Sequence, residues 1–214
     1  YSEGVFSENI LNNRIITHSF LNYSCEYHWG EKSIDFAKKS FGLSYQYKVI
    51  KPLWSVINNT NYKKNNDNNI KYKNYIYLVA FSSSYNLNSI NQNISDDHYL
   101  FLKALSKLIS EKNVIVYFKP KSSFNNYRKS HYEKLKKLSN ELISNRNFKL
   151  VEIRQSSINL LNECDISISM SFSSTTLESL CLGKKSFYFD GNSKFTNADY
   201  YKIPNFVCSK LEDI

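Results

Sequence analysis

From residue 75 onward, short apolar runs alternate with amphipathic segments, and this alternation constrains the fold more than any other feature. The first run, residues 75–81, is almost continuously apolar, as is typical of a strand buried on both faces of a sheet. The next segment, residues 95–112, has apolar residues at a helical spacing and begins with Ser95 and Asp96, both common helix caps. A strand followed by a helix of this length predicts a right-handed crossover to a parallel strand.

The same alternation continues through the rest of the chain. Further strands are predicted at residues 113–119, 148–153, 165–170, 186–190 and 206–208. Further helices are predicted at residues 127–145, 156–163 and 173–182. Gly183 follows the last of these and is expected to end it as a C-cap. The sequence therefore predicts an α/β fold, a Rossmann-like doubly wound parallel sheet, over residues 75–214.

A stretch rich in Asn and Lys, residues 58–74, separates this pattern from the leading part of the chain. Eight of its 17 residues are Asn, and so few apolar side chains cannot offset the entropy of ordering it. We predict a linker or loop here. Before it, strand-like residues 14–18 and 47–50 flank a predicted helix at 32–41. Residues 1–57 are therefore expected to be the remnant of an N-terminal α/β domain and the crossing segment.

The chain carries a formal net charge of +9, which favours anionic partners such as nucleotide phosphates, acidic lipid headgroups or nucleic acid. Heavy use of Asn, Lys, Ile and Tyr is also typical of AT-rich genomes, so a solvated basic surface explains the charge equally well. No segment approaches the roughly 20 apolar residues that cross a bilayer, and no signal-peptide pattern is visible.

Cysteines and histidines show no metal-ligand spacing. We interpret the four cysteines as buried free thiols of a protein in a reducing cytosol. Five glycines provide no GxGxxG fingerprint, which argues against a dinucleotide enzyme. The chain begins at Tyr1 and its only methionine is Met170, so we interpret it as an internal fragment or a trimmed mature chain.

The most specific motif, Ser-Met-Ser-Phe-Ser-Ser-Thr-Thr-Leu-Glu at residues 169–178, runs from a predicted strand into a predicted helix. A helix N-terminus presents unpaired N–H groups and a positive dipole end, both of which favour anions. Ligands of open parallel sheets bind just past the carboxyl ends of the strands. We predict that Ser173, Ser174 and Thr175 bind a phosphate, although a plain helix cap would use the same serines. Glu178 is either a partner for a ribose hydroxyl or a surface acid.

The chain contains, in this order, a predicted strand, the motifs SxSST, LE and GKK, a second predicted strand and an Asp. This pattern resembles the C-terminal domain of GT-B glycosyltransferases that build bacterial surface polysaccharides. The pattern also resembles related transferases that use CDP-glycerol or CMP-activated sugars. In that group a Ser-Ser/Thr pair at the helix start binds the donor phosphate, and an acidic residue follows within the helix. The resemblance implies phosphate binding by Ser173, Ser174 and Thr175 and ribose or base binding by Glu178. It covers residues 75–214, and more loosely the chain from His28 to Trp54.

A second motif, Lys119-Pro120-Lys121, follows a predicted buried strand and should lie at the same edge of the sheet. Several relatives have Lys-Pro-His-Pro here, with the histidine near the donor phosphate. This chain has Lys121 at the position of that histidine, which counts against a polyol-phosphate transferase. The resemblance implies that Lys119 and Lys121 bind phosphate. Simple strand-end residues with both lysines in water would look the same.

Two weaker segments complete the predicted cleft. Ser82 and Ser83 follow the first strand, where relatives have a flexible loop. Arg154 and Ser156 follow the third strand, where relatives bind the nucleobase, largely through backbone groups. Serines and arginines at strand ends are common in purely structural roles as well.

These observations predict the donor site of a glycosyltransferase that transfers sugar from a nucleotide-activated donor to a capsule or lipopolysaccharide glycan. The resemblance implies no metal and no cofactor, a glycan or lipid-linked acceptor, and a cytoplasmic location with contact at the inner membrane face. We assign no catalytic base, because GT-B enzymes usually supply it from the first domain. Alternatives are a CDP-glycerol type polyol-phosphate transferase and a non-enzymatic basic α/β module. No folded motif for specific nucleic-acid recognition is present.

Overall fold

The protein is seen in a computed structural model, and the chain divides into two compact units, residues 6–65 and a larger unit that contains residues 66–214. The structure describes residues 25–28, 46–49, 74–83, 94–121, 123–124, 133–170, 173–193, 196 and 199–210. The expectations for residues 14–18, 32–41 and 58–73 lie outside these described residues.

In the smaller unit, β1 (Cys25–His28) and β2 (Gln46–Val49) form a two-stranded parallel pair. Cys25 lies opposite Gln46 and His28 opposite Val49. The strand expected at residues 47–50 is therefore present with its start shifted by one residue, whereas β1 was not predicted. Parallel pairing requires a crossover between the strands, as in other α/β units.

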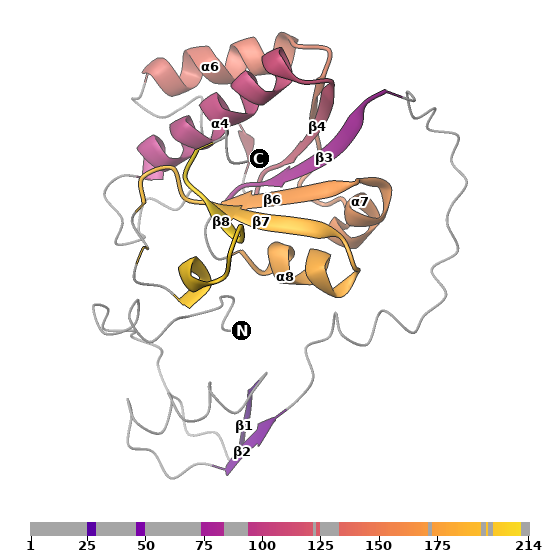
Figure 1. Ribbon diagram of the computed structural model, residues 1–214, viewed down its shortest axis with the longest axis vertical. Coiled ribbons are helices and arrows are strands. Elements are labelled where there is room, and N and C mark those ends of the chain that lie inside the picture. Colours follow the sequence, from indigo (N-terminus) through magenta and orange to yellow (C-terminus); the bar gives the residue numbers. More distant parts are fainter. Residues whose placement is uncertain are drawn as a thin grey trace. The chain divides into compact units, whose positions relative to one another are not determined.

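The larger unit contains a six-stranded sheet in which every pair is parallel, in the order β5-β4-β3-β6-β7-β8 (Figure 1). The strands are β3 (Ile76–Phe81), β4 (Val114–Lys119), β5 (Phe148–Leu150), β6 (Ile166–Met170), β7 (Lys185–Phe189) and β8 (Val207–Cys208). The helices are α4 (Ile94–Glu111), α6 (Glu133–Ser144), α7 (Ser157–Glu163), α8 (Ser174–Cys181) and the 3-10 helix η1 (Asp199–Lys202).

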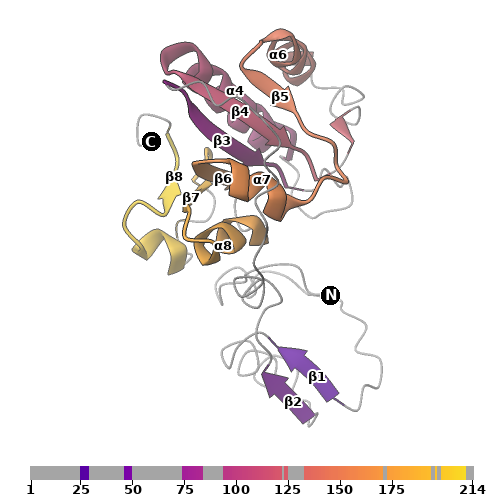
Figure 2. The ribbon, with the colours of Figure 1, turned by 90° about the vertical axis from the view of Figure 1, so that its right-hand side faces the viewer.

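Helices cover both faces of this sheet. α4 and α6 lie on one face, and α7 and α8 lie on the other (Figures 1 and 2). The chain runs outward from β3 through β4 to β5 and then returns to place β6 on the other side of β3. This is the doubly wound arrangement expected from the sequence, and strand order reverses between β3 and β6.

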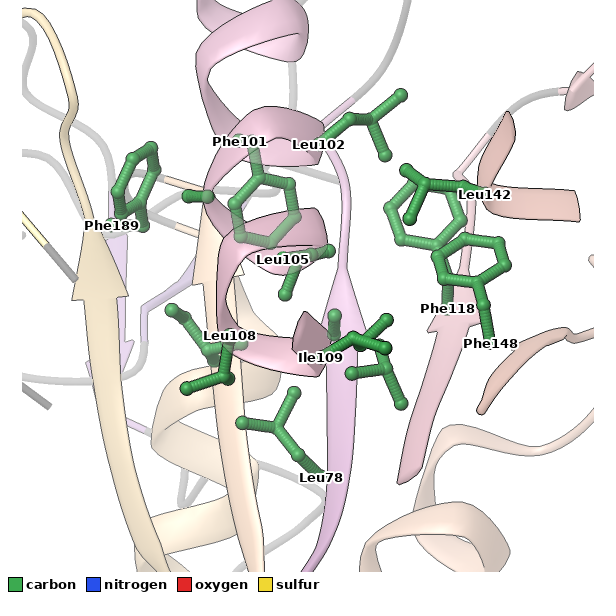
Figure 3. Close-up of a cluster of buried hydrophobic side chains, with 14 of the residues drawn as sticks. Leu78, Phe101, Leu102, Leu105, Leu108, Ile109, Phe118, Leu142, Phe148 and Phe189 are labelled. Carbon is green, nitrogen blue, oxygen red and sulfur yellow. The ribbon is translucent and has the colours of Figure 1, made fainter. Parts of the chain in front are cut away.

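The larger apolar core fills the space between the sheet and the two helices α4 and α6. Leu78 and Ala80 of β3 belong to it, whereas Val79 and Phe81 belong to a second cluster on the α7 side. Both alternating faces of β3 are therefore buried, which explains its continuous apolar run. Figure 3 shows Phe101 of α4 directed toward the sheet, where its ring lies 5.5 Å from the ring of Phe189.

Some predicted boundaries differ from those observed. β5 ends at Leu150 instead of 153, because a turn in which the Gln155 N–H donates to the Glu152 carbonyl (3.1 Å) takes the chain out of the sheet. α4 begins at Ile94, so Ser95 lies inside the helix and not before it. Helix α6 is described from Glu133, and residues 127–132 of its prediction lie outside the described part.

Gly183 confirms the predicted C-cap of α8. Its φ of 70° is in the left-handed region, and its N–H donates to the Leu180 carbonyl at 2.9 Å. Cys164 and Cys208 are buried free thiols as expected, but Cys181 is exposed on the last turn of α8, so burial was wrongly predicted for it. None of the helices in the described segments is long and apolar enough to span a membrane.

Truncation of Phe118 should cost about 3–5 kcal/mol of unfolding free energy, because the cavity left in a close-packed core cannot collapse. Phe118 is 0% exposed, and its ring centroid lies 5.6 Å from those of Phe124 and Phe148. Chemical denaturation of Phe118→Ala measures the loss. Ile143→Ala on α6, at a side chain 40% exposed, is the control and should change stability by about 0.5 kcal/mol or less. Equal losses in both variants would contradict this assignment of the core.

Candidate functional site

Sheet register places three polar side chains in one row at the carboxyl edge. Phe81 of β3 is paired with Lys119 of β4 on one side and with Ser169 of β6 on the other. Ser169 is paired in turn with Tyr188 of β7. Paired residues of neighbouring strands point to the same face, so Lys119, Ser169 and Tyr188 all lie on the face covered by α7 and α8.

The start of α8 is held by side-chain hydroxyls. Ser173 occupies the N-cap position with extended backbone, but its side chain makes no capping hydrogen bond. Its Oγ lies 2.8 Å from Thr175 Oγ1, which lies 2.9 Å from Ser169 Oγ on β6. The Tyr188 hydroxyl donates to the Ser173 carbonyl at 3.0 Å. The interpretation of Ser173 as a plain side-chain cap is therefore wrong.

Glu178, one turn into α8, accepts a hydrogen bond from Ser174 Oγ at 3.2 Å. Burial raises the pKa of the Glu178 carboxyl, and the Ser174 hydrogen bond and the nearby charge of Lys119 oppose this rise. The carboxylate therefore lies in a partly desolvated position, and it is not the freely solvated acid that a helix surface would present.

Lys119, the last residue of β4, interacts with the loop after β5 through a hydrogen bond and with Glu178 of α8 through its charge. Its Nζ donates to the Ile153 carbonyl at 2.8 Å. Burial lowers the pKa of the Lys119 ammonium, and attraction to the Glu178 carboxylate partly offsets this effect. A lysine in this position is a partly desolvated cation, which favours the approach of an anion.

Ser82 and Ser83 join three strand ends. Ser82 is buried, and its Oγ accepts a hydrogen bond from the Lys121 backbone N–H at 3.1 Å. The Ser83 N–H points at the sulfur of Met170, the last residue of β6, at 3.5 Å. The residues after β3 and β4 and the last residue of β6 therefore meet at the point where strand order reverses. The side chain of Lys121 itself is exposed.

Arg154 and Ser156 are not drawn into this network among the described residues. Both side chains are exposed in the loop between β5 and α7, and Ser156 is the N-cap residue of α7 without a side-chain capping bond. The loop reaches the network through the Ile153 carbonyl instead. The structure thus brings together Lys119, the serine cluster and Glu178, and leaves the predicted base-binding side chains at the surface.

Sequence reasoning missed Tyr188 and His98. Tyr188 lies within an apolar strand and looks like an ordinary core residue in the sequence. His98 is 0% exposed in the first turn of α4, and its Nε2 lies 3.4 Å from the Ser83 carbonyl oxygen. The spacing of His98 to Phe101, Leu102 and Leu105 already places it on the buried helix face, and this signal was available.

The helices that begin near the carboxyl edge differ in charge. α4 carries Asp96 and Asp97 in its first turn, and α6 carries Glu133, whereas the first turns of α7 and α8 have no acidic residue. Acidic side chains neutralise the positive end of a helix dipole, so α7 and α8 are better suited to an anion than α4 and α6. Among the described residues, no group of three or more His, Cys, Asp or Glu side chains could hold a metal ion.

Comparison with protein-family models matches residues 6–214 to the family described as polysaccharide biosynthesis PFTS motif proteins. The chain belongs to this family. A search of curated protein sequences finds no significant match.

Solved structures show the same fold as this family member. The structure of Staphylococcus aureus MnaA with UDP matches with a TM-score of 0.54 and 11% identity, over 89% of this chain and 48% of that one. The wall teichoic acid polymerase TagF, as its H444N variant, matches with a TM-score of 0.52 and 12% identity, over 88% and 47%. The chain thus spans about half the length of these proteins and, as predicted, has the Rossmann-like fold of one half of a GT-B structure.

Stability should depend on pH through Glu178. Because burial raises the pKa of this carboxyl in the folded state above its ordinary value of 4.5, its contribution is largest below that value and is lost as pH rises through the raised pKa. The unfolding free energy of the wild type minus that of Glu178→Gln should therefore fall as the pH rises above the ordinary carboxyl pKa of 4.5. Denaturation at several pH values measures this difference. Glu141→Gln, at an exposed side chain of α6, controls for the loss of a surface charge. A difference that rises with pH would contradict the desolvated environment.

Proposed function

We propose that this chain supplies the nucleotide-donor site of a glycosyltransferase that acts in polysaccharide synthesis. The observation that carries the proposal is the group formed by Lys119, Glu178 and the start of α8, at the carboxyl edge where strand order reverses. In open α/β sheets, ligands bind at that place because the adjoining loops diverge there. Family membership supplies the biological context, polysaccharide synthesis.

The charges at this edge suit a phosphate group. A helix N-terminus carries roughly half a positive charge, and the first turn of α8 has no acidic residue to oppose it. Lys119 adds a full positive charge that is partly desolvated. In our proposal both act on the donor phosphates and stabilise the negative charge that develops on the departing diphosphate.

The residues predicted at the start of α8 and after β4 then have a role in the proposed site. Lys119 binds phosphate directly, and the exposed Lys121 adds long-range attraction. Ser173, Ser174 and Thr175 form the turn that receives the phosphate, and Glu178 binds a ribose hydroxyl. The loop that contains Ile153 contacts the nucleobase through its backbone. No metal or cofactor is invoked for these steps.

The family is named for a PFTS motif, and this chain contains two related sequences. Phe-Ser-Ser occurs at residues 81–83 and again at residues 172–174. The second, preceded by Ser171, differs from Pro-Phe-Thr-Ser by a serine in place of proline and a serine in place of threonine. Ser82 and Ser83 follow β3, and Ser173 and Ser174 begin α8, so these serines lie at the carboxyl edge where strand order reverses, which supports this edge as the functional one.

The general base that activates the acceptor hydroxyl is not assigned to this chain. Structures of similar fold are about twice as long, and the base belongs to the other half in our proposal. The acceptor is a glycan or a lipid-linked precursor at the inner face of the cytoplasmic membrane. The 214-residue chain should accordingly bind donor but transfer little or no sugar.

A polyol-phosphate transferase of the CDP-glycerol type remains the second candidate. The fold similarity to the wall teichoic acid polymerase TagF motivates it. Lys121, in place of a histidine that such enzymes carry, argues against it. Both candidates use a nucleotide-activated donor, so the same binding experiment separates them by the nucleotide that binds.

Nucleotide binding should be visible as thermal stabilisation of the chain. A ligand at 100 times its Kd adds about 2.7 kcal/mol to the stability of the folded state, so a shift in Tm is readily measured. The panel contains CMP, CDP, UDP and GDP with their sugar conjugates and CDP-glycerol. Stabilisation by one nucleotide class identifies the donor, and selective stabilisation by CDP-glycerol would favour the polyol-phosphate reading.

Lys119→Met should weaken the Kd of that nucleotide by about tenfold to a hundredfold, as expected for the loss of one charge-assisted hydrogen bond. Lys185→Met is the matched control, because Lys185 is exposed at the opposite, amino end of β7. Calorimetric titration of both variants gives the two Kd values. Equal affinities in the two variants, or no nucleotide binding by the wild type, would contradict the proposed site.

A further inference from the structure

The buried Tyr188 of β7 is hydrogen bonded to the start of α8. Neither the family resemblance nor the proposed function assigns a role to this residue. We propose that Tyr188 is a positioning residue, which holds the phosphate-binding turn of α8 in its binding geometry without touching the ligand. This inference rests on the proposed function, because it concerns how that same turn is held.

Tyr188 is suited to a permanent donor role. Its side chain is 0% exposed, and burial raises the pKa of its hydroxyl, so the phenol stays protonated at physiological pH. The hydroxyl donates to the Ser173 carbonyl at 3.0 Å, and the same carbonyl accepts the Thr176 N–H at 3.4 Å. The N-cap residue of α8 is thus fixed by strand β7 as well as by its own helix.

The hydroxyl of Thr175 provides a second anchor, this time to β6. It lies 2.9 Å from Ser169 Oγ and 2.8 Å from Ser173 Oγ, so it joins the strand to the N-cap side chain. A hydroxyl has one proton to donate, and here both of its neighbours are within the protein. Two strands therefore hold the same turn, one through the Ser173 carbonyl and one through its hydroxyl.

The ring of Tyr188 is itself held in place by the segment that follows β7. Its centroid lies 5.5 Å from that of Tyr200 and 5.2 Å from that of Phe206, both in edge-on geometry. The direction of the hydroxyl is thus determined by residues 199–208 of the chain. A turn fixed in advance loses less conformational entropy when an anion binds, so the affinity is higher.

The arrangement also identifies the atoms that remain for the ligand. The two hydrogen bonds among the Ser169, Thr175 and Ser173 hydroxyls use two of their three protons, so phosphate contact falls to the one remaining hydroxyl proton, the backbone N–H groups of the turn and Lys119. Loss of the Tyr188 hydroxyl would then weaken binding by releasing this turn, although no atom of Tyr188 contacts the phosphate.

The test compares two Tyr→Phe substitutions that each remove one hydrogen-bonded hydroxyl near the carboxyl edge and keep the ring. Tyr188→Phe removes the bond to Ser173, and the control Tyr201→Phe removes the hydrogen bond from Tyr201 to Asp190 (2.5 Å), after β7. The probes are inorganic pyrophosphate and the nucleotide that stabilises the wild type, titrated by calorimetry. We expect Tyr188→Phe to raise both Kd values about three- to tenfold and Tyr201→Phe to leave them within about twofold.

Two further readouts separate positioning from general loss of stability. Amide chemical shifts of Ser174 and Thr175 should respond to pyrophosphate less in Tyr188→Phe than in the wild type. Thr175→Val should weaken binding in the same direction, and Thr175→Ser, which keeps the hydroxyl, should restore it. Equal Kd values for Tyr188→Phe and wild type, or equal losses in both Tyr→Phe variants, would overturn the inference and leave the proposed function intact. Absence of binding by the wild type would overturn both.

Discussion

Parallel pairing of β3 with both β4 and β6 is the constraint on which the rest of the structure depends. Because Phe81 is in register with Lys119 on one side and Ser169 on the other, three strands end at the same height. Their loops must then converge, and the chain reverses direction across the sheet at that place. A shift of one residue in either pairing would turn Lys119 or Ser169 to the opposite face, away from α8. Such a shift would also exchange the side chains of the moved strand between two close-packed apolar clusters that are built from different residues, and this packing opposes it.

One face of the sheet carries most of the apolar core, and the other carries the hydroxyl groups of the candidate site. The face under α4 and α6 holds the large aromatic and aliphatic core. The face under α8 is rich in hydroxyls: Ser167 Oγ lies 2.6 Å from Ser186 Oγ, and Ser169 Oγ lies 2.9 Å from Thr175 Oγ1. Buried hydroxyls add little net stability even when they are hydrogen bonded, but their directional bonds specify position. The second face therefore gives up packing energy and gains a helix start of defined geometry.

The spacing of apolar residues and the positions of residues that end helices and strands were sufficient to predict most of the fold. Continuous apolar runs indicated strands buried on both faces, and Gly183 marked the end of α8 because its backbone requires a left-handed conformation. The end of β5 was not predictable in the same way, because Val151 to Ile153 have sheet-forming residues and a turn at Glu152 removes them from the sheet. Strand propensity is a local property, so it cannot predict a turn that the return of the chain to α7 imposes.

The candidate site was predicted residue by residue only where chemistry and position coincide in the sequence. Lys119 and the serine cluster follow strands directly, and the edge that gathers them follows from parallel topology alone. The bond from Lys119 to the Ile153 carbonyl joins residues 34 apart and depends on register across β4 and β5. No periodic pattern contains that information. Tyr188 was missed for a related reason. The sequence of an apolar strand does not show which of its side chains donates a hydrogen bond to another element.

Lys119 and Glu178 would respond together to an anion in the proposed site. Burial lowers the pKa of one and raises that of the other, so each is displaced toward its neutral form, and their mutual attraction offsets only part of that cost. A phosphate beside Lys119 would add a second negative partner and stabilise the ammonium, while it would push the carboxyl of Glu178 further toward protonation. A protonated Glu178 can donate a hydrogen bond as well as accept one, and a sugar hydroxyl is a suitable partner for either. The same desolvation that makes the pair costly in the unliganded protein would therefore couple phosphate binding in the proposed site to the protonation of Glu178, the residue proposed to bind the ribose.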